Sequence, residues 1–195
     1  MTIAASPTYP ALPTLVHYPH PALRKRAGEV TVFDDALRTF CQGMFSCMEL
    51  SKGVGLAAPQ VGVSKRIFIT DHARRDEGCS DRRIWINPRI EKATGCTSYE
   101  EGCLSFPGIY ARVERHNRFD VVFHNEWGAE QRLSLDVEAG DFLGIVVQHE
   151  LDHLDGKVFV DLLAESQLTL IRKRLKELEQ TYRKTTGKAG SVLRR

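Results

Sequence analysis

The chain lacks the features of a membrane or secreted protein. Its 195 residues contain no apolar run near the ~18–20 residues that a membrane-spanning helix needs. Its N-terminus has no basic segment followed by an apolar stretch, so we expect no signal peptide. Its five cysteines form no Cys-x-x-Cys pair and no even set, which favours free thiols in a reducing compartment. We therefore expect a cytoplasmic protein that has no membrane partner.

A strong excess of one charge is also absent. The 27 basic and 25 acidic residues leave a formal net charge of +2, which gives no electrostatic basis for direct nucleic-acid recognition. Basic residues do gather near the C-terminus, at 172–174 and 194–195, but such runs are most often solvated helix faces. Residues 53–62 are rich in glycine yet lack the Gly-Lys-Ser/Thr ending of a phosphate-binding loop.

What remains is a chain of a length that suits one domain with a single core. Apolar residues at helical spacing predict an N-terminal helix, a central helix and an amphipathic, mostly exposed C-terminal helix, at 34–50, 142–155 and 164–183. Alternating or apolar runs predict strands at 66–70, 83–87, 111–115, 119–124 and 131–136, with a short strand or extended piece at 158–160. We expect the dipeptide Asn87-Pro88 to end its strand.

These elements predict an α+β fold in which antiparallel strands surround the central helix. Residues 1–14 are rich in proline, alanine and threonine, and we expect them to form a loose arm. A single domain should occupy 15–183. The basic residues 184–195 should form a disordered tail.

The central helix carries the clearest chemical motif. His149 and His153 are four residues apart, so both imidazoles lie on one helix face and can bind one ion. Glu150 lies beside them and can reach a water on that ion without being a ligand. This His-Glu-x-x-His pattern is the signature of helical metal hydrolases, although the same spacing also occurs on ordinary solvated helices.

The apolar run at 142–147 supports the metal site, because it predicts that this helix is largely buried. Buried polar groups without partners cost roughly 1–3 kcal/mol each, and an ion would satisfy them. Gly156 can take the left-handed position that ends the helix. The motif still lacks a third ligand and a group that binds the reacting carbonyl.

Two other stretches can supply these groups. In the first, Gly53-Val54-Gly55-Leu56-Ala57-Ala58-Pro59-Gln60, the glycines allow backbone to approach a ligand closely, although the stretch alone is equally typical of a tight loop. In the second, Glu100-Glu101-Gly102-Cys103-Leu104-Ser105, a bend would expose a thiol near a backbone N–H. An isolated cysteine is more often a buried structural residue, but the three motifs in this order are jointly very unusual.

Together the three motifs resemble those of the peptide deformylases, over roughly residues 15–183. The resemblance implies a hydrolase that removes the N-formyl group from the formyl-methionine of newly made polypeptides and releases formate. It implies one divalent ion, held by Cys103, His149 and His153. It also implies that Glu150 is the catalytic acid and base, that Gln60 and the Leu104 N–H stabilise the oxyanion, and that Gly55 binds the substrate chain.

Other assignments follow from this resemblance. The methionine side chain should occupy an apolar pocket formed by Val54, Tyr99, Ile145 and Val146. The family favours Fe²⁺ as the native ion, although Zn²⁺, Ni²⁺ or Co²⁺ suit the same ligands. The basic C-terminal helix suggests ribosome contact, a hypothesis from charge alone.

The sequence departs from the family at one position and leaves alternatives open at others. Tyr110 occupies a position where some relatives have an arginine, and it receives no role. Arg115 pairs with Glu101 behind the site, or both are simply solvated. A metallopeptidase would use Asp161 or Glu165 as the third ligand, and a purely structural site would need a fourth, such as Cys96.

Overall fold

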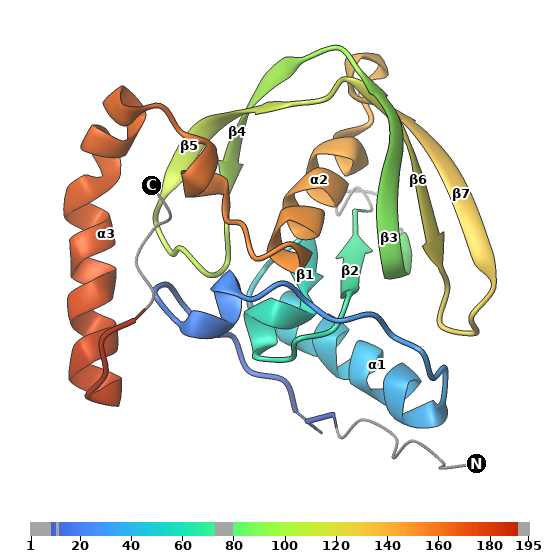
Figure 1. The fold of residues 1–195 in the computed structure, drawn as a ribbon, viewed down its shortest axis with the longest axis horizontal. Helices are drawn as coiled ribbons and strands as arrows, with labels where there is room; N and C mark the ends of the chain where they lie inside the picture. Colours follow the sequence, from blue (N-terminus) through green and yellow to red (C-terminus); the bar gives the residue numbers. More distant parts are fainter. Residues whose placement is uncertain (1–8, 11, 73–79, 191–195) are drawn as a thin grey trace.

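The structure is a computed structural model that describes residues 9–10, 12–72 and 80–190. Within these residues, three α-helices and two antiparallel sheets form the fold, and helix α2 (Phe142–Leu154) lies at its centre (Figure 1). The larger sheet has the order β1-β2-β3-β6-β7. Its strands are β1 (Gly55–Ala57), β2 (Ile67–Asp71), β3 (Arg82–Thr94), β6 (Arg118–His124) and β7 (Glu130–Asp136). The smaller sheet pairs β4 (Thr97–Gly102) with β5 (Tyr110–Arg115). The expected α+β fold with strands around a central helix is confirmed.

Helix α1 (Asp35–Leu50) forms as its sequence predicts. The side chain of Asp34 accepts a hydrogen bond from the backbone N–H of Leu37 at 2.9 Å, which satisfies one of the free donors at the helix start. The apolar stripe of the helix is buried against β1 and β2. Its members are Leu37, Phe40, Cys41, Met44, Phe45 and Met48. A packing role for Cys41 and Met44 is therefore confirmed.

Strand β3 continues beyond Asn87-Pro88, so the predicted strand end at this dipeptide is wrong. The pairing with β6 shifts register between Ile86 and Arg89, and Asn87 takes a left-handed backbone with φ of 51°. The Asn87 side chain exchanges two hydrogen bonds with the backbone of Val30, at 2.9 and 2.8 Å. Proline is tolerated at such a bulge because no ladder hydrogen bond is required of it there.

Other predicted boundaries also change. Strands β1 and β4 had no counterpart among the predicted strands. The short strand or extended piece expected at 158–160 is wrong, because Phe159–Leu162 forms a 3-10 helix. Helix α3 (Glu165–Thr186) includes residues 184–186, so the prediction of a disordered tail from residue 184 is wrong there, and the helix ends at Gly187 with φ of 68°. Residues 191–195 of that tail lie outside the described residues.

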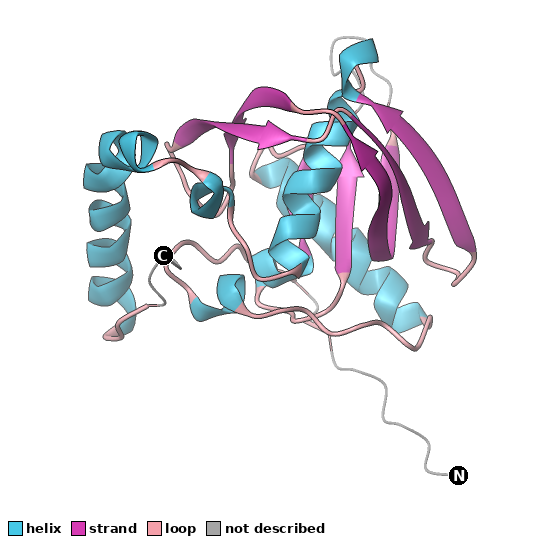
Figure 2. Cartoon of the chain, turned by 45° about the horizontal axis from the view of Figure 1, so that its top comes forward, coloured by secondary structure: helices cyan, strands magenta, loops and turns pink. Residues whose placement is uncertain are grey.

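The two ends of the described chain pack differently. Tyr9, in the expected loose arm, stacks its ring on Phe40 with centroids 4.8 Å apart, whereas residues 1–8 lie outside the described residues. Helix α3 lies on the opposite side of the molecule from β7 (Figure 2). It buries Leu175 and Leu178 and is otherwise largely exposed, as predicted. None of the described helices combines the length and hydropathy that crossing a membrane would require.

Candidate active site

Helix α2 holds three polar side chains in the interior. His149, Glu150 and His153 are 8%, 3% and 1% exposed, because the apolar residues of the helix contact the sheet and the 3-10 segments around it. The helix ends where the sequence predicts, with Gly156 in the left-handed region at φ of 70°. Burial of three ionisable groups on one helix requires specific partners.

Cys103 reaches the two histidines from the end of β4. The turn after it is closed by the Phe106 N–H, which donates to the Cys103 carbonyl at 2.9 Å. The Cys103 Sγ lies 3.3 Å from the His153 Nε2, and one ligand atom from each of Cys103, His149 and His153 lies within 4.8 Å of the others. Three donors converging on one point are typical of a catalytic metal centre with an open position.

The alternative ligands do not join this group. Asp161 forms an ion pair with Arg24, and Cys96 is exposed between β3 and β4. The metal-ligand cluster found in the described part of the chain contains Cys103 and the two histidines only. The structure therefore favours the set with the cysteine over the metallopeptidase set.

The charges at the site fit a divalent ion. Burial lowers the pKa of His153 well below its usual value, so this ring is neutral. Burial would also lower the pKa of His149, but Cys103 and Glu101 outweigh it and raise this pKa well above its usual value, so a metal ion would bind with release of the His149 proton. Burial also raises the pKa of Glu150 to about 7. Its Oε2 is buried and has no hydrogen-bond partner among the described groups. An ion beside Glu150 would supply the positive charge that this carboxylate lacks.

A buried ion-pair network supports His149 from behind. Glu101 accepts hydrogen bonds from Arg115 Nε and Nη2 at 2.6 and 2.9 Å, and its Oε2 lies 2.8 Å from His149 Nδ1. Arg115 also donates to Asp152 at 2.6 Å. Burial alone would raise the pKa of Glu101, but the bonds from Arg115 and His149 outweigh it and lower this pKa to about 2. The predicted pair of Arg115 and Glu101 is confirmed, and it fixes the ring that carries a metal ligand.

Gln60 is held beside the cysteine by three contacts. Its Oε1 accepts from the Ala57 N–H at 2.8 Å, which leaves the amide nitrogen facing the site. That nitrogen donates to Ser105 Oγ at 3.3 Å and lies 3.5 Å from Cys103 Sγ. The side chain is 1% exposed, so its orientation is fixed by packing as well.

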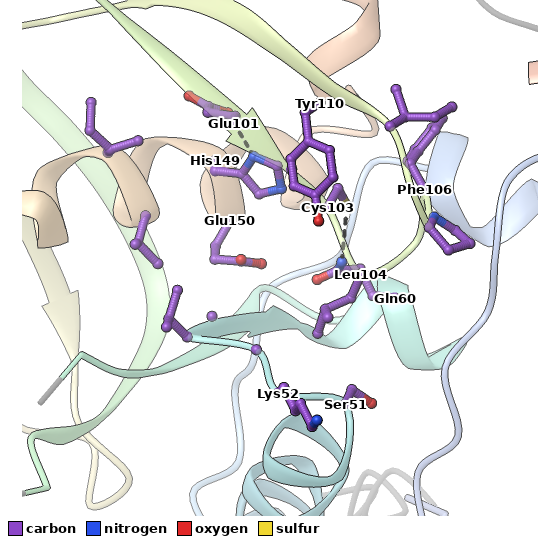
Figure 3. Close-up of a pocket in the computed structure, with 18 of the residues that line it drawn as sticks. Ser51, Lys52, Gln60, Glu101, Cys103, Leu104, Phe106, Tyr110, His149 and Glu150 are labelled. Carbon is purple, nitrogen blue, oxygen red and sulfur yellow. Dashed lines mark hydrogen bonds and ion pairs between the residues drawn. The ribbon is translucent and has the colours of Figure 1, made fainter. Parts of the chain in front are cut away.

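These residues border a pocket of about 730 Å³ (Figure 3). Its lining includes every side chain predicted for the methionine, namely Val54, Tyr99, Ile145 and Val146. Gly55 is required where the first motif approaches α2, since a Cβ there would lie 2.5 Å from the Glu150 Oε1. The structure thus brings together the three motifs and the apolar pocket.

Several pocket residues were not predicted from the sequence. Phe142 lines the pocket and contacts the Tyr99 ring, with centroids 5.5 Å apart. Its spacing of one helical turn before Ile145 could have identified it. Leu15, Ser51 and Lys52 also line the pocket, but no motif marks them. They reach it through tertiary packing of the N-terminal segment and the end of α1.

The fold and a cluster of one cysteine and two histidines on a His-Glu-x-x-His helix together place the chain among the metal-dependent hydrolases. Residues 13–169 match the family model of the polypeptide deformylases. A peptide deformylase from Chromobacterium violaceum is 43% identical over 171 residues, which cover 87% of this chain and 98% of that one. The chain belongs to the peptide deformylase family.

Solved structures agree with this assignment. Peptide deformylase 1B from Arabidopsis thaliana, in complex with an inhibitor, superposes with a TM-score of 0.84 at 33% identity, covering 92% of this chain and 97% of that one. Peptide deformylase from Plasmodium falciparum gives a TM-score of 0.81 at 38% identity, with 89% and 99% covered. The protein is therefore a hydrolase that removes the N-formyl group from the N-terminal formyl-methionine of newly made polypeptides.

Proposed function

We propose that Cys103, His149 and His153 hold one divalent ion and that deformylation takes place in the pocket beside it. The observation that carries this proposal is the convergence of their ligand atoms within 4.8 Å of one another, next to the buried Glu150. When bound, such an ion polarises a carbonyl and makes water acidic enough to react near neutral pH. A thiolate and two neutral imidazoles leave room for it to do so.

Glu150 is the acid and base of the proposed reaction. Its carboxylate takes a proton from the attacking water and delivers it to the leaving amine, as a group with a pKa near the working pH does best. Gly55 leaves the space in which Glu150 lies, since a Cβ there would lie 2.5 Å from the Glu150 Oε1 and 2.7 Å from the Val146 Cγ1. This environment keeps bulk water away from the proton that is transferred.

The oxyanion that forms at the formyl carbon is stabilised by Gln60 and by the backbone N–H of Leu104. Gln60 supports this role because its carbonyl oxygen is already bound by Ala57, so its NH₂ group is directed toward Cys103. Leu104 supports it by its position directly after the metal-ligating cysteine. Such preorganised donors are effective because they need no rearrangement during the reaction.

The methionine side chain occupies the apolar part of the pocket. Ile145 and Val146 lie on α2 about one helical turn before His149, and Tyr99 lines the pocket from β4. The following residues of the peptide extend beside Gly55 and the turn after Cys103, as an added strand does at a sheet edge. Val54 borders the same path.

We infer that Fe²⁺ is the native ion, with Zn²⁺, Ni²⁺ and Co²⁺ as functional alternatives. A mixed thiolate and imidazole set suits all four, and family membership favours iron. With iron the site should be oxygen-sensitive, and Cys103 is the group that oxidation would remove. Residues 15–183 form the catalytic domain in this proposal, which the family match over 13–169 supports.

We also propose that the enzyme acts in the cytoplasm on nascent chains, in the manner of its bacterial relatives. All four described cysteines are free, which supports a reducing compartment. The basic residues of α3 are the candidate for ribosome contact, although Arg172 and Arg174 already pair with Glu165 and Glu177. Salt-dependent co-sedimentation with ribosomes would support this contact, and absent or salt-insensitive co-sedimentation would exclude it.

One experiment tests the proposal directly. Formate release from a formyl-Met-Ala-Ser peptide should be measured together with the metal content of the same sample. We expect turnover proportional to a content approaching one ion per chain, and loss of turnover after chelation. Turnover that persists in the chelated, metal-free protein would contradict the proposal.

A further inference from the structure

Lys52 stands in a backbone conformation that lysine rarely adopts. It follows Ser51 at the C-terminal end of α1, where the Gly53 N–H donates to the Met48 carbonyl at 2.9 Å. Its φ is 57°, in the left-handed region where glycine is strongly favoured at this helix position. Residues kept in such conformations are concentrated at functional sites, which makes the choice of lysine informative.

Lys52 is one of the residues that line the pocket. Figure 3 shows Lys52 and Ser51 at the end of α1, across the pocket from His149. No ion pair to Lys52 occurs within the described residues, whereas Lys92, the other lysine with a left-handed backbone, pairs with Asp120 at 3.1 Å. The ammonium of Lys52 is thus a cation that no carboxylate of the described chain neutralises.

The carboxylates of the pocket lie elsewhere. Glu101 is bound by Arg115, and Glu150 adjoins the metal ligands. Glu100 belongs to β4, where it stands opposite Arg112. Lys52 therefore places a positive charge at its end of the pocket, and a ligand that extends to this end would interact with that charge.

The position of Lys52 along the chain indicates which part of a peptide it meets. Gly55 lies against Glu150, and Lys52 precedes it by three residues. A Cβ at Gly53 would lie 2.6 Å from the Leu104 Cδ1, so residues 53–55 run between α2 and the turn after Cys103, and Lys52 stands at the outer end of this edge. A peptide whose formyl-methionine occupies the pocket would bring its third residue within reach of the lysine side chain.

We propose that Lys52 is a specificity-determining residue that favours substrates with an acidic side chain in the third position. This inference rests on the proposed function, since it assumes that the peptide extends from the metal centre along residues 52–55. The ammonium attracts the aspartate or glutamate of the substrate and disfavours lysine or arginine there. Because the contact is exposed, the preference should be about two- to fivefold and should shrink as salt rises.

The test compares kcat/KM for amidated formyl-Met-Ala-Xaa-Ser peptides in which Xaa is Glu, Gln or Lys. For the unsubstituted enzyme we expect the order Glu, Gln, Lys, with the Glu-to-Lys ratio falling in 0.5 M salt. Lys52→Met should reduce that ratio to about one, Lys52→Glu should reverse it, and Lys52→Arg should preserve it. Lys52→Gly removes the charge and suits the backbone, so it gives a well-folded variant that should also lose the preference.

Lys92→Met is the matched control. It removes the same charge from the same backbone conformation at a site away from the pocket, so the ratio should stay at its original value. Equal ratios in the unsubstituted enzyme and Lys52→Met, with the Gln peptide still turned over, would overturn the role of Lys52 and leave the proposed function intact. No turnover of any of the three peptides by the metal-loaded enzyme would instead overturn the proposed function.

Discussion

Glu150 carries an ionisable carboxyl group in a buried position, where a charged group is disfavoured. It is 3% exposed and has an unpartnered oxygen, which a purely structural role would not require. We expect Glu150→Gln to keep the ion and the fold but to lower kcat by at least about 10²–10⁴-fold, because the amide cannot transfer the proton. Formate release and metal content should be measured together. Retained turnover in that variant would remove Glu150 from the mechanism.

Cys103 separates the deformylase site from other metal sites on a His-Glu-x-x-His helix. Cys103→Ser should sharply weaken metal binding, because a hydroxyl is a much poorer ligand than a thiolate for these ions. Metal content after dialysis, measured by mass spectrometry, gives the readout. Cys96→Ser changes an exposed cysteine and should leave the content unchanged. Full metal retention in Cys103→Ser would contradict the cysteine as a ligand and would favour the metallopeptidase alternative.

Gln60 tests the oxyanion assignment. Gln60→Ala should lower kcat by roughly 10²–10³-fold with a smaller change in KM, because the lost hydrogen bond is strongest in the transition state. The buried amide also bonds Ala57 and Ser105, so circular dichroism should accompany the kinetics. A rise in KM alone would show that Gln60 binds substrate without stabilising the oxyanion.

At the scale of elements, the site depends on how α2 meets the β4–β5 sheet. Arg115 of β5 joins Glu101 of β4 to Asp152 of α2, and all three contacts are 2.6–2.9 Å long. Removing the arginine leaves the carboxylate of Glu101 buried beside His149 without its main partner. Arg115→Met should therefore cost roughly 3–5 kcal/mol of unfolding free energy in urea titrations. It should also weaken metal binding by about 10–100-fold.

Arg118 provides the control for this prediction. It lies on β6 and pairs with Asp136 and Glu138, but its side chain is 59% exposed. Arg118→Met should change the unfolding free energy little, because exposed ion pairs contribute little to stability. Similar losses in the two variants would show that burial of the Arg115 network contributes no additional stability.

At the scale of the whole molecule, the buried carboxylate makes stability depend on pH. The pKa of Glu150 is about 7 in the folded, metal-free chain and about 4.5 when unfolded. A raised folded pKa means that the stabilisation is complete below pH 4.5 and is lost as pH rises through 7. The loss should amount to about 3 kcal/mol in the metal-free protein, by proton linkage.

Chelated protein and its Glu150→Gln variant should be unfolded in urea at pH 5 and at pH 8. We expect the variant to gain stability relative to the unsubstituted protein at pH 8 and to differ little at pH 5. Glu101 contributes at lower pH, because its pKa is about 2. His149 and His153 also have shifted pKa values, but both are present in the two proteins, so their contributions largely cancel in the difference. A pH-independent difference between the two proteins would contradict the linkage.

Much of this molecule could be predicted from local sequence. The stripe of α1, its Asp34 cap and the left-handed Gly156 each follow from short-range chemistry, and the structure confirms them. The bulge at Asn87 could not be predicted, because it depends on hydrogen bonds to Val30, which is distant in the sequence. The helical turn at 159–162 was mistaken for a strand because short apolar runs suit both.

The parts of the candidate site that form local motifs could be predicted, and the parts that depend on tertiary packing could not. The metal ligands form recognisable motifs, so Cys103, His149 and His153 could be grouped before any distance was known. The part of the pocket formed by Leu15 and Lys52 could not be predicted, because it depends on how the N-terminal segment and the end of α1 pack. Pairing of Arg115 with Asp152 likewise needs the angle between two elements, which no local pattern specifies.

The cysteine and the second histidine of the site are 50 positions apart. A cation seated between them would act as a removable cross-link that closes this long segment into a ring, and closing a ring disfavours the unfolded chain. Resistance to heat and to proteases should therefore rise and fall with the supply of metal. Oxidation of the Cys103 sulfur would open this ring, so the protein should lose activity and rigidity at the same time.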